Sequence, residues 1–400
     1  MQHALPTVYP LVVSASLLVT GAAVADWPEW RGPGRNGLVE KSPALVSSFP
    51  AQSPNWQSEA IPGGDRGGRG SLAVHSGRVY GLASVAAEFD EVFCLNAETG
   101  KTIWKARLPG VGTDAGSSTP CIAGGKLFVI GSGSRVHCLN IDDGKPVWEA
   151  KLARTANRAV ASSIAVVGTK VVVLADVLTG LDATTGAVLW TQKQIAGHES
   201  SPARWSTRRG EYVICNSARE THCVDTADGR VVWSVAGGGK STPVVAREYG
   251  GDFLINMSDG RRAGLSAYRL TDANPKLLWT LEVSDRGSSP VAFDGHVYAV
   301  AGGGNGHGAR LLCVHTDTGK VAWDETIDFA EVSSPVVADG KMFAVCGTFL
   351  WILQASPERY SVLSQNDCRV TLCTSPAIAD GRLFVRQSNA IACFDLRTDR

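Results

Sequence analysis

The chain has 400 residues, of which 38 are basic, 38 are acidic and 44% are hydrophobic. The balanced charge argues against nucleic acid as the main partner, because nucleic-acid-binding proteins usually carry a basic surface. The 44 glycines recur at regular positions, which indicates turns in a packed globular fold rather than a disordered chain.

The first 25 residues have the pattern of a signal peptide. The apolar run LVVSASLLVTGAAV is followed by the small-residue sequence AVA and then by Asp26. A run of about fourteen residues before such a site is typical of a signal peptide and is too short to span a bilayer. The run is preceded by His3 but by no Lys or Arg, and no Cys lies at its end to carry a lipid. We expect cleavage near Ala25 and a periplasmic or secreted protein with no transmembrane span; an uncleaved anchor is the alternative.

Six tryptophans recur at a nearly constant spacing along the rest of the chain. The intervals are 44, 42, 43, 46 and 44 residues between Trp104, Trp148, Trp190, Trp233, Trp279 and Trp323. A period of this length is typical of solenoids and propellers. The runs between the tryptophans are short and rich in β-branched residues, such as KLFVI, KVVVL and HVYAV, and they show almost no helical periodicity. The repeat therefore predicts an all-β fold.

Each repeat contains four predicted strands. In the second repeat these are SSTPCIAG, KLFVIGS, RVHCLN and KPVWEAKL. The DDG between the last two, like the ETG, TTG and ADG of other repeats, predicts a hairpin turn in which Gly supplies the positive φ. Four antiparallel strands in a repeat of this length are typical of a β-propeller blade.

Eight repeats can be placed along the chain, and the eighth lacks a fourth strand. Their first strands begin at Ser71, Ser117, Ser162, Ser200, Ser241, Ser288, Ser333 and Thr374. The sequence NWQSEAIPG, which contains Trp56, supplies a spare strand before the first repeat. We therefore predict an eight-bladed β-propeller over residues 54–400, preceded by an extension at 26–53. In this ring Trp56 lies beside the strand at 391–394 and closes the last blade, which removes the exposed sheet edges.

The repeat resembles that of a known family. The pattern L-[ND]-x-x-[TD]-G-x-x-x-W, with S-[ST]-P in the first strands, resembles the repeats of pyrroloquinoline-quinone (PQQ)-type propellers from residue 55 to the C-terminus. The segment DWPEWRGPGRNG at 26–37 is similar to the start of exported PQQ-like repeat proteins. The family includes eight-bladed quinoprotein dehydrogenases and a cofactor-free propeller lipoprotein that assists assembly of outer-membrane barrels. The resemblance is specific for the fold and weak for function.

The chain departs from both kinds of family member. The dehydrogenases are typically longer, with insertions that build the active site, and they often carry adjacent cysteines, whereas this chain has no Cys-Cys pair. Their calcium-binding and base carboxylates have no assignable positions here. The lipid-bearing Cys of the assembly lipoprotein is also missing. No catalytic or metal-binding residue is therefore carried over.

Half of the ten cysteines fall at one position of the third strand, namely Cys94, Cys138, Cys223, Cys313 and Cys393. Other repeats place small or apolar residues there, namely Gly180, Ala267 and Ile352. Facing sheets pack about 10 Å apart, whereas the Cα atoms of a disulfide rarely lie beyond about 7 Å. We therefore predict buried free thiols in spite of the exported location. Cys368 and Cys373 are the only pair close enough in sequence for a disulfide to be tested.

Charged residues precede the predicted first strands, on the connections around one mouth of the channel. Cations at such a mouth would hold an anionic ligand through charge-assisted hydrogen bonds. The candidate cofactor-binding residues are Arg66, Asp114, Arg158, Lys240, Arg286 and Glu331, and their neighbours include Asp65, Arg69, His198, Glu199 and Asp285. The alternative is that these loops are only solvated. The eight histidines form no metal signature, so no metal site is predicted.

The leading hypothesis is an exported, non-catalytic scaffold of the cell envelope that binds an envelope protein or a small anionic ligand at the channel mouth. We expect it to be a monomer. The alternative is a PQQ-dependent oxidoreductase of alcohols or sugars, which needs PQQ with calcium, a carboxylate base and a shielded pocket. A polysaccharide-binding module, suggested by the exported location and by exposed aromatic residues, is a third hypothesis.

Overall fold

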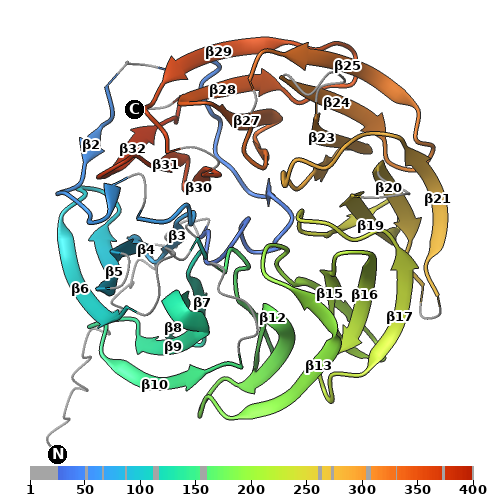
Figure 1. The fold of residues 1–400 in the computed structure, drawn as a ribbon. Helices are drawn as coiled ribbons and strands as arrows, with labels where there is room; N and C mark the ends of the chain where they lie inside the picture. The colour runs from blue at the N-terminus through green and yellow to red at the C-terminus, as the bar shows by residue number, and fades with distance from the viewer. Residues whose placement is uncertain are drawn as a thin grey trace, which may run out of the picture.

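The computed structural model describes residues 26–49, 53–64, 67–85, 88–110, 117–153, 160–259, 264–271, 274–302, 308–329, 331–371 and 374–398. Its strands form eight sheets arranged as blades around a central axis (Figure 1). The fold is the predicted eight-bladed β-propeller. Within the described residues, the structure contains no helix with the length and apolar character that crossing a membrane requires.

The strands follow the repeats closely. Blades 1 and 2 contain β3 (Ala73–His75), β4 (Arg78–Val85), β5 (Phe89–Asn96), β6 (Thr102–Pro109), β7 (Cys121–Ala123), β8 (Lys126–Gly131), β9 (Arg135–Asn140) and β10 (Pro146–Lys151), with the 3₁₀ turn η2 (Ser132–Ser134) between β8 and β9. Blades 3 and 4 contain β11 (Ala165–Val167), β12 (Lys170–Asp182), β13 (Val188–Gly197), β14 (Ala203–Thr207), β15 (Gly210–Asn216), β16 (Glu220–Asp225) and β17 (Val231–Ala236).

The second half of the ring repeats this arrangement. Blades 5 and 6 contain β18 (Val244–Glu248), β19 (Gly251–Ser258), β20 (Gly264–Arg269), β21 (Lys276–Leu281), β22 (Val291–Phe293), β23 (His296–Gly302), β24 (Ala309–His315) and β25 (Val321–Ile327). Blades 7 and 8 contain β26 (Val336–Ala338), β27 (Lys341–Cys346), β28 (Phe349–Gln354), β29 (Val362–Asp367), β30 (Ala377–Ala379), β31 (Arg382–Arg386) and β32 (Ile391–Asp395), joined by β1 (Leu38–Val39) and β2 (Trp56–Gln57).

Two sheets differ from the predicted four strands. In blade 3, β12 runs through the positions of both the second and the third strand, with Asp176 in a left-handed conformation (φ 67°) between its two halves. The sheet of blade 7 has five strands, because β1 pairs in parallel with β26. The first difference comes from a turn too short to interrupt the strand, and the second from the N-terminal extension entering the ring.

The N-terminal strand closes the ring, as predicted. Trp56 pairs with Cys393 and Gln57 with Ala392, so β2 is the missing outer strand of blade 8. A buried arginine holds the same junction from the inside. Arg386 of blade 8 donates to the carbonyl of Leu82 at 2.6 Å and to that of Gly67 at 2.9 Å, both in or beside blade 1. Burial lowers the pKa of Arg386 to about 10, which still leaves the side chain charged at neutral pH.

The tryptophan that ends the repeated sequence L-[ND]-x-x-[TD]-G-x-x-x-W joins neighbouring blades. Trp104 of blade 1 donates its indole N–H to the carbonyl of Ile141 in blade 2 at 3.1 Å, and its ring lies under Gly144. Four other indoles lie under a hairpin glycine of the next blade in the same way: Trp56 under Gly100, Trp148 under Gly186, Trp190 under Gly229 and Trp279 under Gly319. The glycine therefore serves the hairpin through its positive φ and the interface through its missing side chain.

The cysteine position of the third strand lies directly opposite the tryptophan of the fourth strand. The register pairs Cys94 with Trp104 and Cys313 with Trp323, and it places Gly180 opposite Trp190. The nine cysteines that the structure describes are all buried and unbonded. This agrees with the prediction of free thiols, and Cys373, the proposed partner of Cys368, lies outside the described residues.

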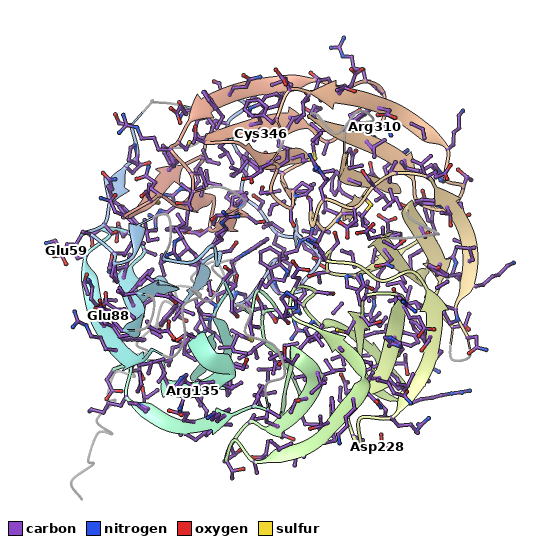
Figure 2. All side chains as sticks on the ribbon, viewed as in Figure 1. Glu59, Glu88, Arg135, Asp228, Arg310 and Cys346 are labelled. Carbon is purple, nitrogen blue, oxygen red and sulfur yellow. The ribbon has the colours of Figure 1, made fainter. Side chains whose placement is uncertain are left out.

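A ring of hydroxyl groups joins the first strands around the channel. In blades 2 to 7, the second hydroxyl-bearing residue at the start of the first strand accepts a hydrogen bond from the backbone N–H of its counterpart in the preceding blade. These bonds run from Ser71 to Thr119, Thr119 to Ser163, Ser163 to Ser201, Ser201 to Thr242, Thr242 to Ser289 and Ser289 to Ser334. These bonds hold the inner strands in register, while charged residues such as Glu59 and Asp228 lie at the rim of the ring (Figure 2).

Candidate functional site

Six residues were predicted at the channel mouth formed by the connections that precede the first strands. Arg66, Asp114 and Arg158 lie outside the described residues. The described part of the mouth contains the other three, namely Lys240, Arg286 and Glu331.

Lys240 lines a pocket of about 390 Å³ between the connections of blades 3, 4 and 5. His198 and Glu199, which were predicted beside it, line the same pocket, and the Nζ of Lys240 lies 3.5 Å from Glu199 Oε1. Its inner wall includes Asn216, whose side-chain N–H groups reach the carbonyl of Ser241 at 2.9 Å and the amide oxygen of Asn256 at 3.0 Å. The pocket therefore has polar groups on its inner wall and a paired charge at its rim.

The other described mouth residues do not line this pocket. Asp285 lies between blades 5 and 6, where its carboxylate accepts from the backbone N–H of Lys240, the hydroxyl of Ser241 and the backbone N–H of Gly287. Arg286 donates to the carbonyl of Gly308, and Glu331 is exposed on the connection to blade 7. The mouth thus brings together Lys240, His198 and Glu199 and leaves Arg286 and Glu331 on other connections.

The opposite mouth is covered by residues 26–49, which we name the N-terminal cap. The cap crosses the centre of the ring (Figure 1) and contacts almost every blade. Trp27 exchanges two backbone hydrogen bonds of 2.8 Å with Val74 in the first strand of blade 1, and the carbonyl of Pro28 accepts from Ile122 of blade 2. Further along, β1 joins blade 7, and Val46 donates to the carbonyl of Leu396 in blade 8.

A buried ion-pair cluster fixes the cap. The carboxylate of Glu29, which is 3% exposed, pairs with Arg35 at 2.7 Å and with Arg204 of blade 4. Arg35 also donates to the carbonyls of Ile164 and Ser163 in blade 3. The Oε2 of Glu29 that pairs with Arg35 also accepts a hydrogen bond from the thiol of Cys121. Burial together with this carboxylate raises the pKa of that thiol. Paired and hydrogen-bonded in this way, the charges tolerate burial.

Arg31 is the second buried charge of the cap. Its Nη2 donates to the carbonyls of Asn36 and Pro335, both at 3.2 Å, and its backbone is left-handed (φ 61°). Burial lowers its pKa to about 9, so the guanidinium is charged at neutral pH. Within the described residues its Nε and Nη1 have no hydrogen-bond partner.

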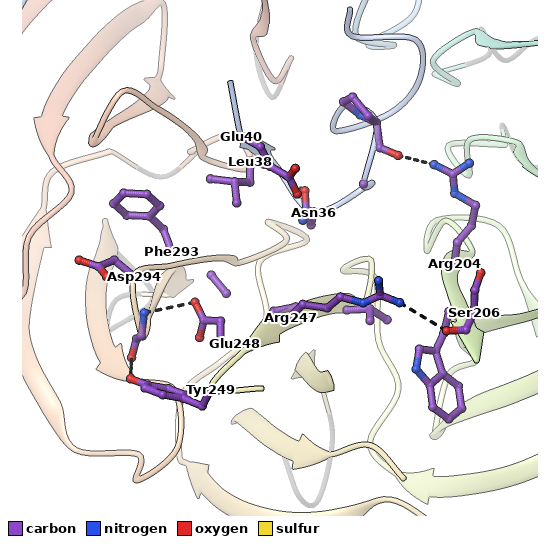
Figure 3. Close-up of a pocket in the computed structure, with 17 residues that line it drawn as sticks. Asn36, Leu38, Glu40, Arg204, Ser206, Arg247, Glu248, Tyr249, Phe293 and Asp294 are labelled. Atoms are coloured by element: carbon purple, nitrogen blue, oxygen red, sulfur yellow. Dashed lines mark hydrogen bonds between the residues drawn. The ribbon is translucent and has the colours of Figure 1, made fainter. Parts of the chain in front are cut away.

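A groove of about 660 Å³ runs between the cap and the hairpins that follow the first strands of blades 4, 5 and 6 (Figure 3). One wall is formed by cap residues, including Asn36 and Glu40. The facing wall includes Arg247, Glu248 and Tyr249 of blade 5. The carboxylate of Glu248 accepts the backbone N–H of Gly295 at 3.2 Å through Oε1. The groove is therefore lined by acids, two arginines and three aromatic side chains.

The fit of these sites to a PQQ and calcium centre can be assessed for the described residues. In that part of the chain no three His, Cys, Asp or Glu side chains gather closely enough to hold a metal ion. Lys240 is paired with Glu199, and Asp285 accepts bonds that join two blades. The described mouth residues therefore do not by themselves assemble a calcium and quinone site.

The N-terminal cap and its groove were missed by the sequence reasoning, which treated residues 26–53 only as an extension. Arg35 binds backbone carbonyls, and these carry no side-chain signal in the sequence. One signal was available. The segment 26–37 combines two tryptophans and two arginines, a composition unlike that of a solvated linker.

Comparisons with known proteins agree with the fold. The family described as outer membrane protein assembly factor BamB matches residues 45–248, 175–269 and 266–371. The outer membrane protein assembly factor BamB of Yersinia pestis is 28% identical over 197 residues, which are 42% of this chain and 47% of that protein. The chain thus spans about half the length of this curated relative.

Solved structures share the architecture. BamB from Moraxella catarrhalis is 16% identical with a TM-score of 0.66, covering 86% of this chain and 98% of that one. A europium-containing methanol dehydrogenase is 14% identical with a TM-score of 0.69, covering 92% and 90%. The quinohemoprotein alcohol dehydrogenase from Comamonas testosteroni is 13% identical with a TM-score of 0.68, covering 92% and 80%. At these identities the structures show the fold alone, whereas the family matches extend over most of the sequence. The chain therefore belongs to the PQQ-like propeller family described as outer membrane protein assembly factor BamB.

Proposed function

We propose that the protein is an exported, non-catalytic scaffold of the cell envelope that binds an envelope protein at the pocket lined by Lys240, His198 and Glu199. The observation that carries this proposal is that the described charges of this mouth are tied to one another and to the backbone. Lys240 pairs with Glu199, and Asp285 holds the connections of blades 5 and 6 together. A fixed polar rim of this kind suits recognition of another surface.

The family membership supports the same role. The relative from Yersinia pestis is named as an outer membrane protein assembly factor, which favours a periplasmic location and an envelope partner for this chain. The signal-peptide pattern at residues 1–25, which lie outside the described residues, agrees with export. A small anionic ligand bound by Lys240 is the second candidate for the same pocket.

Site-specific crosslinking tests the proposal. A photoreactive residue at position 240 or 199 should trap the same envelope protein, and a residue at position 277, on the outer face of blade 5, should not. The purified partner should then bind the wild-type protein, lose affinity for Lys240→Glu, and regain affinity in the charge-reversed pair Lys240→Glu with Glu199→Lys. Equal binding by wild type and Lys240→Glu would refute the site.

A PQQ-dependent oxidoreductase is the alternative that the shared fold leaves open. Titration with PQQ and calcium, followed by a dye-linked assay with alcohols and sugars, separates the two. We expect no turnover. Reproducible oxidation that is lost in Asp114→Ala or Glu331→Ala would replace the scaffold proposal, whereas quinone binding without turnover through Lys240 or Arg286 would agree with it.

A further inference from the structure

Tyr249 occupies a turn position that its side chain disfavours. It is the first central residue of the hairpin between β18 and β19, with a left-handed backbone at φ 48°. Five other hairpins of the described residues also have positive φ at both central residues. Their first central residue is small or acidic, namely Ser76, Gly124, Asp294, Asp339 and Asp380. Bulky residues rarely adopt this conformation, and such strain is concentrated at functional sites. The aromatic ring at this position therefore needs an explanation beyond the turn.

The ring of Tyr249 is held in a fixed place and is 57% exposed. It stacks on His315, with ring centroids 5.9 Å apart and an angle of 15° between the planes. Its hydroxyl donates to the carbonyl of Gly295 at 3.3 Å, and a side chain at that glycine would collide with the hydroxyl. The blade 5 hairpin and its neighbours thus present a flat aromatic surface at the edge of the groove (Figure 3).

The polar groups around this ring are mainly hydrogen-bond acceptors. Three carboxylates line the groove, those of Glu40, Glu248 and Asp294, against the guanidinium groups of Arg204 and Arg247. Arg204 is already paired with Glu29 of the cap. Oε2 of Glu248 is buried and has no donor among the described residues. The groove therefore favours a neutral or cationic ligand rich in hydrogen-bond donors and disfavours an anion.

We propose that this groove binds an oligosaccharide of neutral or amino-bearing sugars. The apolar C–H face of a pyranose ring would pack on Tyr249, and its hydroxyl groups would donate to Glu248 and Asp294. The volume of about 660 Å³ lies within the range of about 300–1,000 Å³ that small-molecule sites occupy. The groove is at the opposite mouth from the pocket of Lys240, so this proposal and the scaffold proposal can fail separately.

Calorimetric titration of the full-length mature protein tests the proposal with four defined probes. These are the β-1,4-linked tetrasaccharides of glucose, of N-acetylglucosamine and of glucosamine, and the α-1,4-linked tetrasaccharide of galacturonate. We expect at least one of the first three to bind and the anionic galacturonate not to bind. Tyr249→Asn should weaken binding at least about tenfold, which corresponds to losing about 1.4 kcal/mol. Glu248→Gln should also weaken binding while keeping the shape of the groove.

The choice of asparagine separates binding from folding. Because Asn tolerates the left-handed conformation, Tyr249→Asn should melt at the same temperature as wild type or higher. Leu277→Ala, on an exposed residue of the outermost strand of the same blade, serves as a control and should bind normally. Three outcomes would overturn the proposal: no binding of any neutral or amino sugar, undiminished binding by Tyr249→Asn, or binding of a short Val- and Thr-rich peptide in place of the sugars.

Discussion

Gly144 in the last hairpin of blade 2 lies on the indole of Trp104 in blade 1, so close that a Cβ at Gly144 would come within 2.5 Å of Trp104 Cε3. Gly144→Ala should therefore be destabilised both by its left-handed backbone (φ 71°) and by a collision with the indole. We expect a loss of about 2–4 kcal/mol in the free energy of unfolding.

Gly124 provides the matched control for this substitution. Its backbone is also left-handed (φ 55°), but a Cβ there meets nothing within 4 Å. Gly124→Ala should lose only the conformational cost of about 1–2 kcal/mol. Equal losses of unfolding free energy in the two variants, measured by chemical denaturation, would show that the contact with the indole adds nothing to the cost of a side chain at Gly144.

The first and second residues of the S-[ST]-P motif should differ in how much stability is lost when their hydroxyl groups are removed. Ser201→Ala removes the acceptor of the Ser163 backbone N–H and should cost about 1–3 kcal/mol, because a buried donor is left without a partner. Ser118→Ala should be nearly neutral, since that buried hydroxyl has no partner among the described residues. A thermal denaturation series that shows no difference would contradict a bonding role for the ring.

Ring closure and the N-terminal cap can be separated by truncation. Removing residues 26–62 takes away β2 and exposes the edge of β32, so we expect aggregation or oligomers. Removing only residues 26–49 leaves β2 in place, and this variant should remain monomeric while losing stability. Light scattering of the two variants checks the prediction, which fails if the longer deletion stays monomeric.

The cysteines should be unreactive until the chain unfolds. Burial raises the pKa of Cys94 to about 11 and that of Cys393 to about 12, so the thiolate is scarce at neutral pH. Titration with a disulfide reagent should find little reaction in the folded protein and at least the nine described thiols after denaturation without reductant. Two or fewer thiols in the denatured sample would show that disulfides form.

Two buried histidines should make the fold sensitive to mild acid. Burial lowers the pKa of His137 and of His222 below the ordinary histidine value of 6.5. Near that pH the unfolded chain binds more protons than the folded one, so stability is full above pH 6.5 and declines as the pH falls through the lowered values. Denaturant midpoints at about pH 7.5 and 5.5 should differ, and the double variant with Gln at both positions should show a smaller difference.

Much of the fold was predictable because each repeat carries its own interface. The period of Trp104, Trp148 and Trp190 predicted the blades, since indole, cysteine position and hairpin glycine meet in one place. The closure by Trp56 followed from counting strands. The long β12 was not predicted, because the sequence around Asp176 contains no residue that marks the turn clearly.

The site was predicted only in part. Lys240, His198 and Glu199 share a pocket because all three precede neighbouring first strands. Arg286 and Glu331 lie on connections farther around the ring. Equivalent positions of successive repeats are spread around the channel, so they do not all meet at one point. Tyr249 was not selected, although aligning its hairpin EYGG with the DG hairpins of blades 6 to 8 would have revealed an unusual turn residue.

The closing strand also has a consequence for how the chain reaches its native state. The N–H of Ile391 donates to the hydroxyl of Ser58 across 333 residues of sequence, and the cap contacts blades from both halves of the ring. Contacts of such high sequence separation slow folding, because loop-closure entropy is lost before they form. The closing strand β2, near the N-terminus, therefore cannot pair until the last blade has been synthesised. Until the C-terminal blade is available, β2 has no partner strand and is exposed to aggregation.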